Sequence, residues 1–367
     1  MNKMILANLM HRPFRAFISI IAVAVEVSLI LLIVGIMLGM LNDSSQRQAG
    51  IGADILVQPP GASLFIGVSG APVSEKVANK IRPLPHVMAV APVVAQLSTS
   101  GNVQVTDGID LESFEAVGGP LPYLSGGPFT GPDSMIVDDL EAGAKHLKVG
   151  DKVDALNHEF TLTGIVEHGR GARQFVPIAT LQDLIGAKGK ASIFYVKLDN
   201  PNNADIVVQE IKSIPGMEQY GVRSLKEYLS LMTSSGVPGL TTVIRVVIGI
   251  AMIIGFIVIF QAMYAAVMER TREIGILKSL GAGKLYIVNA ILRETLLIAV
   301  GGVIVGIAAS YVAQSGLKAH FRTLPLTITP PWLMRATIIA IVGSLLGALY
   351  PALKAAQKDP IDALAYE

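Results

Sequence analysis

The sequence contains no cysteine among its 367 residues. A disulfide framework, a thiolate zinc site, a Cys-ligated iron–sulfur cluster and a cysteine nucleophile are therefore excluded. Charged residues are also scarce, at 16% of the chain against roughly a quarter in ordinary soluble domains. Neither sign of charge dominates, because 29 Lys and Arg accompany 28 Asp and Glu, and this balance argues against nucleic acid as a partner.

Hydrophobic residues make up 51% of the chain and gather in four long blocks. Crossing a bilayer core takes roughly 20 apolar residues in a helix. The blocks predict four transmembrane helices, at residues 17–41, 242–268, 295–317 and 332–353. A signal peptide is the alternative for the first block, but this block exceeds the length of an h-region and no Ala-x-Ala site directly follows it. We therefore expect an uncleaved helix.

Basic residues lie mainly on one side of these helices, which predicts the orientation of the chain. On that side are Lys3, Arg12, Arg15, Arg270, Arg272, Lys278, Lys284, Arg293, Lys354 and Lys358. Close to the membrane on the other side are Arg245, Lys318, Arg322 and Arg335. We expect an amphipathic N-terminus at 1–16, the loop at 269–294 and the tail at 354–367 to be cytoplasmic, with 42–241 and the short loop at 318–331 outside.

The long outside segment, residues 42–241, alternates short β-like runs with short helical ones. Strands are predicted at 53–58, 87–94, 160–166 and 193–198, and helices at 74–82, 138–147 and 203–213. Adjacent Asp138 and Asp139 can each serve as the N-cap of the second of these helices. The predicted fold class is thus a helical membrane protein with four transmembrane helices and an α+β extracytoplasmic domain between helices one and two, in which the run from Leu147 suggests a small inserted β-rich lobe.

Catalytic and metal chemistry finds little support in the sequence. His158-Glu159 and Glu167-His168 flank a β-like segment and lack the helical spacing that puts two imidazoles on one face. Gly281-Ala-Gly-Lys284 lacks both the earlier glycine and the following Ser or Thr of a Walker A loop. We predict no metal site, no catalytic residue and no cofactor on this chain, and so a protein that is not an enzyme by itself.

The predicted cytoplasmic loop begins with a dense charged run that leads into apolar residues at helical spacing. It reads Met268-Glu-Arg-Thr-Arg-Glu-Ile-Gly-Ile-Leu-Lys-Ser-Leu-Gly-Ala282. A short helix at the membrane face is the physical interpretation, and a loop that merely sets topology is the plain alternative.

This run resembles the segment after the second helix in ABC transporter permeases of the MacB/FtsX type. The tail from Tyr350 to Leu364 is similar to the closing motif of the same family, at Pro351, Ala355, Pro360, Ala363 and Leu364. The resemblance implies a prokaryotic inner-membrane permease whose coupling helix docks on an ATPase. The implied coupling residues are Glu269, Arg270, Arg272, Glu273, Ile274, Leu277 and Leu280.

MacB itself carries its ATPase on the same chain, and no ATPase is found in this sequence. The resemblance therefore implies a separate ABC ATPase in two copies, which holds ATP and Mg, and a homodimer of the permease. Membrane lipid and a membrane-fusion or adaptor protein are further expected partners. The expected function is ATP-driven export of an amphipathic compound. The alternatives are an FtsX-like mechanotransmitter that regulates an extracytoplasmic enzyme, a heme exporter and a receptor-like sensor.

Three small-xxx-small motifs in the predicted helices allow close approach of helix backbones in lipid. They are Gly35/Gly39, Gly302/Gly306 and Gly343/Gly347. Packing between two copies of the chain and packing within one chain are both open at this stage.

Glu26 is the one ionisable residue inside the first apolar block, about 13 Å along the helix from Phe17 and so near mid-bilayer. Charge at that depth is costly and usually functional. Glu26 and Gln261 are therefore candidates for an intramembrane substrate or proton site. The alternative is a neutral Glu26 that is hydrogen-bonded to Gln261 or to its own copy in a dimer.

Overall fold

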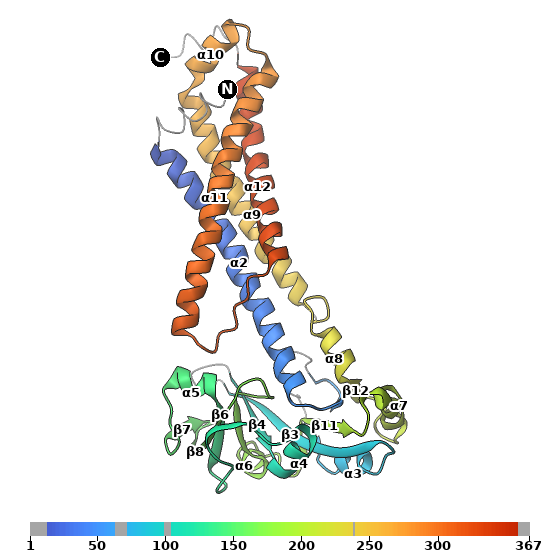
Figure 1. The fold of residues 1–367 in the computed structure, drawn as a ribbon. Helices are drawn as coiled ribbons and strands as arrows, with labels where there is room; N and C mark the ends of the chain where they lie inside the picture. Colours follow the sequence, from blue (N-terminus) through green and yellow to red (C-terminus); the bar gives the residue numbers. More distant parts are fainter. Residues whose placement is uncertain (1–12, 63–71, 99–103, 238, 359–367) are drawn as a thin grey trace. The chain divides into compact units, whose positions relative to one another are not determined.

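The computed structural model describes residues 13–62, 72–98, 104–237 and 239–358. The chain divides into two compact units (Figure 1). The helical unit comprises Met1–Leu38, Thr241–Lys318 and Leu326–Glu367, and the α+β unit comprises Gly39–Leu240 and Ala319–Pro325. Most of the predicted segment 1–16, and Pro360, Ala363 and Leu364 of the tail motif, lie outside the described residues.

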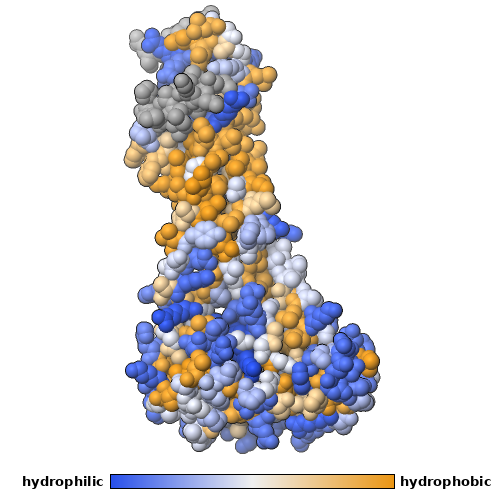
Figure 2. Space-filling model, viewed as in Figure 1, coloured by the Kyte–Doolittle hydropathy of each residue, from blue (hydrophilic) through white to orange (hydrophobic). Residues whose placement is uncertain are grey.

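Four helices in the described chain are long and apolar enough to cross a membrane, as the sequence predicts. They are α2 (Pro13–Gly50), α9 (Leu240–Glu269), α11 (Lys284–His320) and α12 (Pro330–Gln357). Hydrophobic side chains gather on the surface of these helices in Figure 2. Apolar side chains all around a helix are typical of membrane spans, because lipid replaces water as the solvent.

Each long helix exceeds its predicted apolar block, because polar residues extend it on at least one side. The predicted third helix begins at Thr295, whereas α11 begins at Lys284 and includes Glu294, which is buried against a cation. Helix α2 continues past the predicted end at Leu41 to Gly50, with an Asp43–Arg47 ion pair one turn apart in its last turns. A short helix, α10 (Thr271–Ser279), follows α9 as predicted.

The α+β unit is built on a ten-stranded mixed sheet in the described chain, with the order β12-β1-β11-β3-β4-β9-β6-β8-β5 and with β7 paired to β8. The strands are β1 (Ile55–Gln58), β3 (Val87–Ser98), β4 (Gln104–Ile109), β5 (Tyr123–Gly126), β6 (Ser134–Asp138), β7 (Lys152–Ala155), β8 (His158–Val166), β9 (Gln174–Pro177), β11 (Ile193–Leu198) and β12 (Gly221–Ser224). A second, small pair joins β2 (Val73–Ser74) to β10 (Lys190–Ala191).

Apolar and polar residues alternate along β8, so that every second side chain points into the core. Phe160, Leu162 and Val166 are almost fully buried. The predicted β-rich lobe is not separate, because the parallel pairing of β4 with β9 joins its strands to the same sheet. The sheet thus runs unbroken across the unit.

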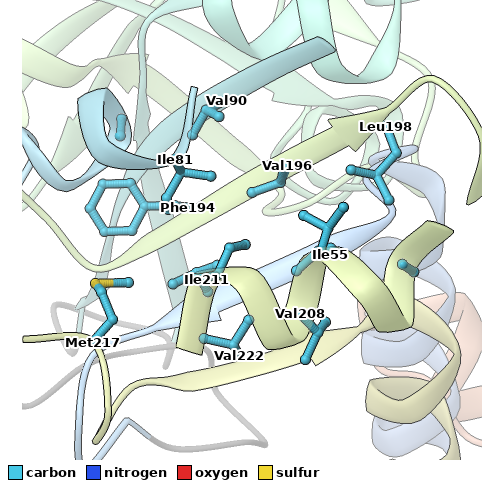
Figure 3. Close-up of a cluster of buried hydrophobic side chains, with 14 of the residues drawn as sticks. Ile55, Ile81, Val90, Phe194, Val196, Leu198, Val208, Ile211, Met217 and Val222 are labelled. Atoms are coloured by element: carbon cyan, nitrogen blue, oxygen red, sulfur yellow. The ribbon is translucent and has the colours of Figure 1, made fainter. Parts of the chain in front are cut away.

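Seven α-helices of the α+β unit cover or flank this sheet in the described residues. They are α3 (Val77–Ile81), α4 (Leu111–Gly118), α5 (Asp139–Lys145), α6 (Ile178–Leu184), α7 (Ala204–Ser213), α8 (Leu225–Leu231) and the last turns of α2, with a 3-10 turn, η1 (Pro201–Asn203), before α7. Helix α7 buries Ala204, Val207, Val208 and Ile211, an apolar stripe at helical spacing, in a core with Ile55 and Phe194 (Figure 3). Asp138, and not Asp139, caps α5, since its carboxylate accepts the backbone N–H of Glu141 at 2.7 Å.

Candidate functional sites

The N-terminal end of α10 is fastened to α11 by a buried ion pair. The Arg270 guanidinium donates two hydrogen bonds to the two carboxylate oxygens of Glu294, at 3.0 and 3.2 Å. The side chains of Arg270 and Glu294 are only 15% and 9% exposed. A forked pair of this kind fixes orientation as well as distance. The ion pair therefore joins the start of α10 directly to α11.

The C-terminal end of α10 is fastened to α12 by Lys278. The ammonium group of Lys278 donates to the carbonyl oxygen of Ala356, at 2.9 Å, and to that of Lys358. Carbonyls at the end of a helix have no partner within the helix, and a cation there is favoured by the helix dipole. Helix α10 thus has polar ties to both α11 and α12.

The apolar residues of α10 fall into two groups. Ile274 and Leu277 are half-buried and line a groove of about 330 Å³ whose walls include Arg270, Glu294 and Tyr286. Ile276 also lines this groove but keeps 44% of its area exposed, and Leu280, the C-cap residue after α10, is 80% exposed. The sequence correctly predicts that Ile274 and Leu277 share one face, and this face lines a groove on the chain itself. Glu269, Arg272 and Glu273 are exposed, and docking of these residues on an ATPase stays a prediction.

Glu26 is buried inside the helical unit, with 2% of its area exposed. Its two carboxyl oxygens have no hydrogen-bond partner in the described part of the chain. They lie against Gly255 of α9, where an added Cβ would come within 1.9 Å of Oε2. The predicted hydrogen bond to Gln261 is wrong, because Gln261 is exposed; it stands more than one and a half turns beyond Gly255, on another face of α9. The predicted substrate or proton site at Glu26 stays a prediction.

The glycine motifs pack helices of one chain against each other. A Cβ at Gly302 or Gly306 would meet Val23, Ala24 and Val27 of α2 at under 3.0 Å, and one at Gly347 would meet the carbonyl oxygen of Phe256 of α9 at 2.8 Å. A Cβ at Gly35 would lie 3.3 Å from the carbonyl oxygen of Thr327 and one at Gly343 would lie 3.6 Å from Met252, and Gly39 is buried. Gly302, Gly306 and Gly347 thus lie against other helices of the same chain, and their packing in a homodimer stays a prediction.

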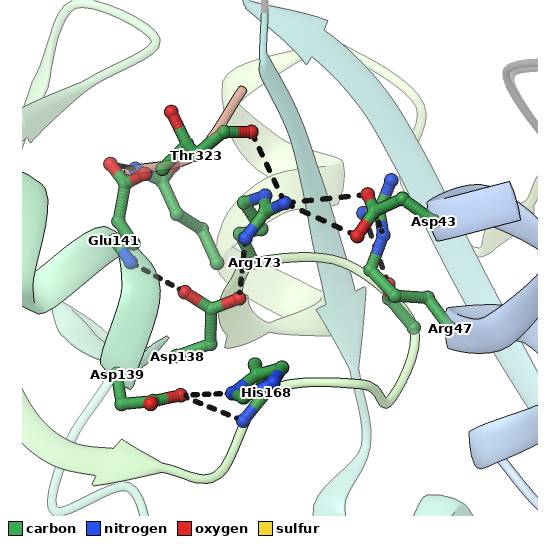
Figure 4. Close-up of polar contacts among 10 residues, drawn as sticks. Asp43, Arg47, Asp138, Asp139, Glu141, His168, Arg173 and Thr323 are labelled. Atoms are coloured by element: carbon green, nitrogen blue, oxygen red, sulfur yellow. Dashed lines mark hydrogen bonds and ion pairs between the residues drawn. The ribbon is translucent and has the colours of Figure 1, made fainter. Parts of the chain in front are cut away.

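A polar cluster in the α+β unit centres on Arg173 (Figure 4). Its guanidinium pairs with Asp138 at 3.2 Å and with Asp43 at 3.3 Å, and donates to the carbonyl of Thr323 at 3.4 Å. Burial raises the pKa of Asp138 to about 6, and the charge of Arg173 opposes this rise. Arg173 thereby ties the end of α2 and the loop between α11 and α12 to the sheet. No motif or spacing in the sequence distinguishes Arg173 from a surface residue.

The two histidine pairs do not converge. His158 contacts Asp133 at 2.8 Å, and His168 contacts Asp139 at 2.9 Å. No group of three His, Asp or Glu residues with metal-binding geometry occurs in the described residues.

Comparison with known proteins decides the family. The family model of the MacB-like periplasmic core domain matches residues 16–214, more than half of the chain, and that of the FtsX-like permease C-terminal domain matches residues 245–360. This chain belongs to the MacB/FtsX family of ABC transporter permeases. The boundary between the two matches lies close to the start of α9, where the chain returns to the helical unit.

Two full-length relatives illustrate the membership. The chain is 25% identical to the macrolide export ATP-binding/permease protein MacB of Shewanella sp. (strain W3-18-1), over all of this chain and 60% of MacB. It is 24% identical to the uncharacterized ABC transporter permease YknZ of Bacillus subtilis, over all of this chain and 98% of YknZ. The chain thus spans about 60% of the length of that MacB relative and nearly all of YknZ.

Among solved structures, the periplasmic region of MacB from Actinobacillus actinomycetemcomitans is similar to this chain, with a TM-score of 0.39 and 16% identity. The match covers 48% of this chain and 92% of that region.

Proposed function

We propose that this protein is the membrane permease subunit of an ABC transporter whose separate ATPase, in two copies, drives export of an amphipathic compound. Family membership supports the permease role. A separate ATPase is supported by the departure of Gly281-Ala-Gly-Lys284 from a Walker A loop and by the near-complete coverage of the permease YknZ. ATP and Mg then belong to the partner, and the permease works as a homodimer.

The observation that carries the proposal is the double fastening of α10. A short helix with exposed Ile276 and Leu280 at its surface is held to α11 by Arg270–Glu294 and to α12 by Lys278. Such a helix suits a docking element, because its apolar side chains can enter a partner's groove. A force on α10 would therefore be transmitted to α11 and α12 through these contacts.

A second set of contacts lies within the α+β unit. Asp43 belongs to α2, and Thr323 belongs to the loop between α11 and α12, and both bind Arg173. Within that unit, one buried guanidinium thus holds the end of α2 and this loop next to β9. This arrangement favours a permease that acts as a lever, and the periplasmic core match to MacB favours an exporter over the mechanotransmitter and heme-exporter alternatives.

Substitutions on α10 test the proposal. A glutamate at Ile276 or Ile274 should reduce co-purification of the ATPase and ATP hydrolysis stimulated by the permease by more than about tenfold, because burying one such side chain is worth about 1.5–3 kcal/mol. Ile206→Glu is a matched control, since Ile206 is 57% exposed on α7 of the other unit. Wild-type ATPase binding and stimulation in both α10 variants would remove the coupling role of this helix.

A further inference from the structure

A cavity of about 240 Å³ lies within the α+β unit. Its walls come from the last turns of α2, from strands β3, β4 and β11, from the loop before β9 and from the loop between α11 and α12. Ligand cavities for drug-sized molecules are typically larger, about 300–1,000 Å³. The space therefore suits a compact molecule or the end group of a larger one.

Part of the cavity lining is apolar. Leu97 of β3, Val105 of β4 and Ile193 of β11 form this part, together with Met40 and Pro325. These side chains offer dispersion contacts and exclude water from the groups beside them. A ligand for this space needs an apolar part.

The cavity lining also includes the buried carboxyl of Asp107, a residue that is 5% exposed. The backbone N–H of Ala172 is hydrogen-bonded to this carboxyl, and Arg47 is the nearest positive charge acting on it. Arg47 is itself paired with Asp43 at 3.1 Å and donates to the carbonyl of Gly171 at 3.3 Å. Arg47, whose positive charge acts on Asp107, is therefore shared with Asp43.

A charge count over this cluster shows an imbalance. Arg173 is divided between Asp43 and Asp138, so two guanidinium groups serve three carboxyl groups when Asp107 is included. The neighbouring Glu141 has its own cation in Lys145, at 2.7 Å. With all three carboxyl groups ionised, the described cluster is one positive charge short of neutrality, and either a proton on Asp107 or a bound cation would supply that charge. Buried charges without a counterion are unfavourable, so an incoming cation would be stabilised here.

An unused donor lies in the same cavity. The Nε2 of Gln104 is buried and has no hydrogen-bond partner among the residues that the structure describes. A buried unsatisfied donor is costly, and an acceptor oxygen on a ligand would satisfy it. Tyr195, by contrast, already donates its hydroxyl to Gln48 at 3.0 Å.

We infer that this cavity binds a small protonated amine that carries an apolar group, with the ammonium on the Asp107 carboxylate and the apolar group against Leu97, Val105 and Ile193. A hydroxyl, ether or carbonyl oxygen on the ligand would accept from Gln104. The inference rests on the proposed function for its biological meaning, because it names the class of compound that the exporter would take.

Binding is measured on the full-length permease in lipid nanodiscs without any ATPase. The probe is 4-fluorobenzylammonium, followed by fluorine NMR, beside its neutral analogue 4-fluorobenzyl alcohol. We expect saturable binding of the ammonium that is more than about tenfold tighter than that of the alcohol. Asp107→Asn, which keeps the side-chain shape, should weaken the ammonium by more than about tenfold, whereas Asp154→Asn on exposed β7 should not.

A second variant tests the place of binding. Val105→Phe places a larger side chain in the space proposed for the apolar group of the ligand. It should abolish binding while Asp107 is unchanged. Equal affinity for ammonium and alcohol, equal affinity in the Asp107→Asn variant, or no saturable binding would each overturn the inference. Because no ATPase is present, these outcomes are separate from a failure of α10 to recruit an ATPase.

Discussion

The ion pair between Arg270 and Glu294 offers a quantitative test of the coupling element. Glu294→Gln removes the negative charge and keeps the volume of the side chain, so the guanidinium of Arg270 remains 15% exposed without a counterion. Breaking a buried pair from one side costs about 3–5 kcal/mol. Because Arg270 keeps some contact with solvent, we expect the lower end, about 3 kcal/mol, or a change of roughly 150-fold in the unfolding equilibrium.

A double-mutant cycle with Arg270→Gln, Glu294→Gln and the double variant isolates the pair from other effects of each substitution. We expect an interaction free energy of about 2 kcal/mol or more, measured by reversible unfolding in mixed detergent micelles. The pair Lys152–Glu159 is a matched control at 2.8 Å, with both side chains about 60% exposed. Exposed pairs contribute about 0.2–1 kcal/mol.

An interaction energy for Arg270–Glu294 as small as that of the exposed control would refute the reasoning, because α10 would then not be fastened to α11 through this contact. The same single variants should lower ATPase stimulation in protein that is still folded, since a loosened α10 transmits less displacement.

Three further predictions concern other parts of the molecule. Gly306→Ala should lower the melting temperature because its Cβ would meet the backbone carbonyl oxygen of Ala24 at 2.7 Å, whereas Gly249→Ala, where an added Cβ meets nothing within 4 Å, should not; equal stability of the two variants would contradict this packing. In this cysteine-free chain, a cysteine at exposed Ile206 should react with an impermeant reagent in intact cells and one at Ser279 should not, and the reverse result would invert the topology. Burial raises the pKa of Asp107 to about 7 from an ordinary 3.8, so this carboxyl stabilises the fold below pH 4 and loses that contribution as the pH rises through 7. Thermal unfolding of Asp107→Asn should therefore show less loss of stability between pH 4 and 8 than the wild type, by an amount on the order of 4 kcal/mol, and an unchanged pH profile would contradict the assigned burial.

Local patterns in the sequence predict much of the architecture. Apolar blocks of bilayer length indicate the four long helices, and the alternation around Phe160 indicates strand β8. Both patterns can be read from one element alone, because each reflects only the environment of that element's own faces. Ends are less predictable. Glu294 looks like a loop residue by charge alone, and only its pairing with Arg270 explains why α11 includes it.

Contacts between distant segments are beyond such patterns. Arg173 follows a glycine-rich loop and resembles an ordinary surface residue until Asp43, Asp138 and Thr323 are brought around it. Likewise, the apolar spacing of Ile274 and Leu277 indicates a shared face, but it does not say that this face lines a groove on the same chain. Two opposite charges, Arg270 and Glu294, lie at the two ends of the loop predicted to be cytoplasmic, and they are the signal in the sequence for a contact between these ends.

The most direct test of the central claim, that α10 receives an ATPase, is photo-crosslinking from the exposed end of this helix. Leu280, with 80% of its area exposed, is replaced by a photoreactive amino acid, and the crosslinked product from native membranes is identified by mass spectrometry. We predict an ABC ATPase chain as the crosslinked partner, and no such product from the same substitution at Ile206. Crosslinking at Leu280 that yields lipid or other proteins, but no ATPase, would contradict the account.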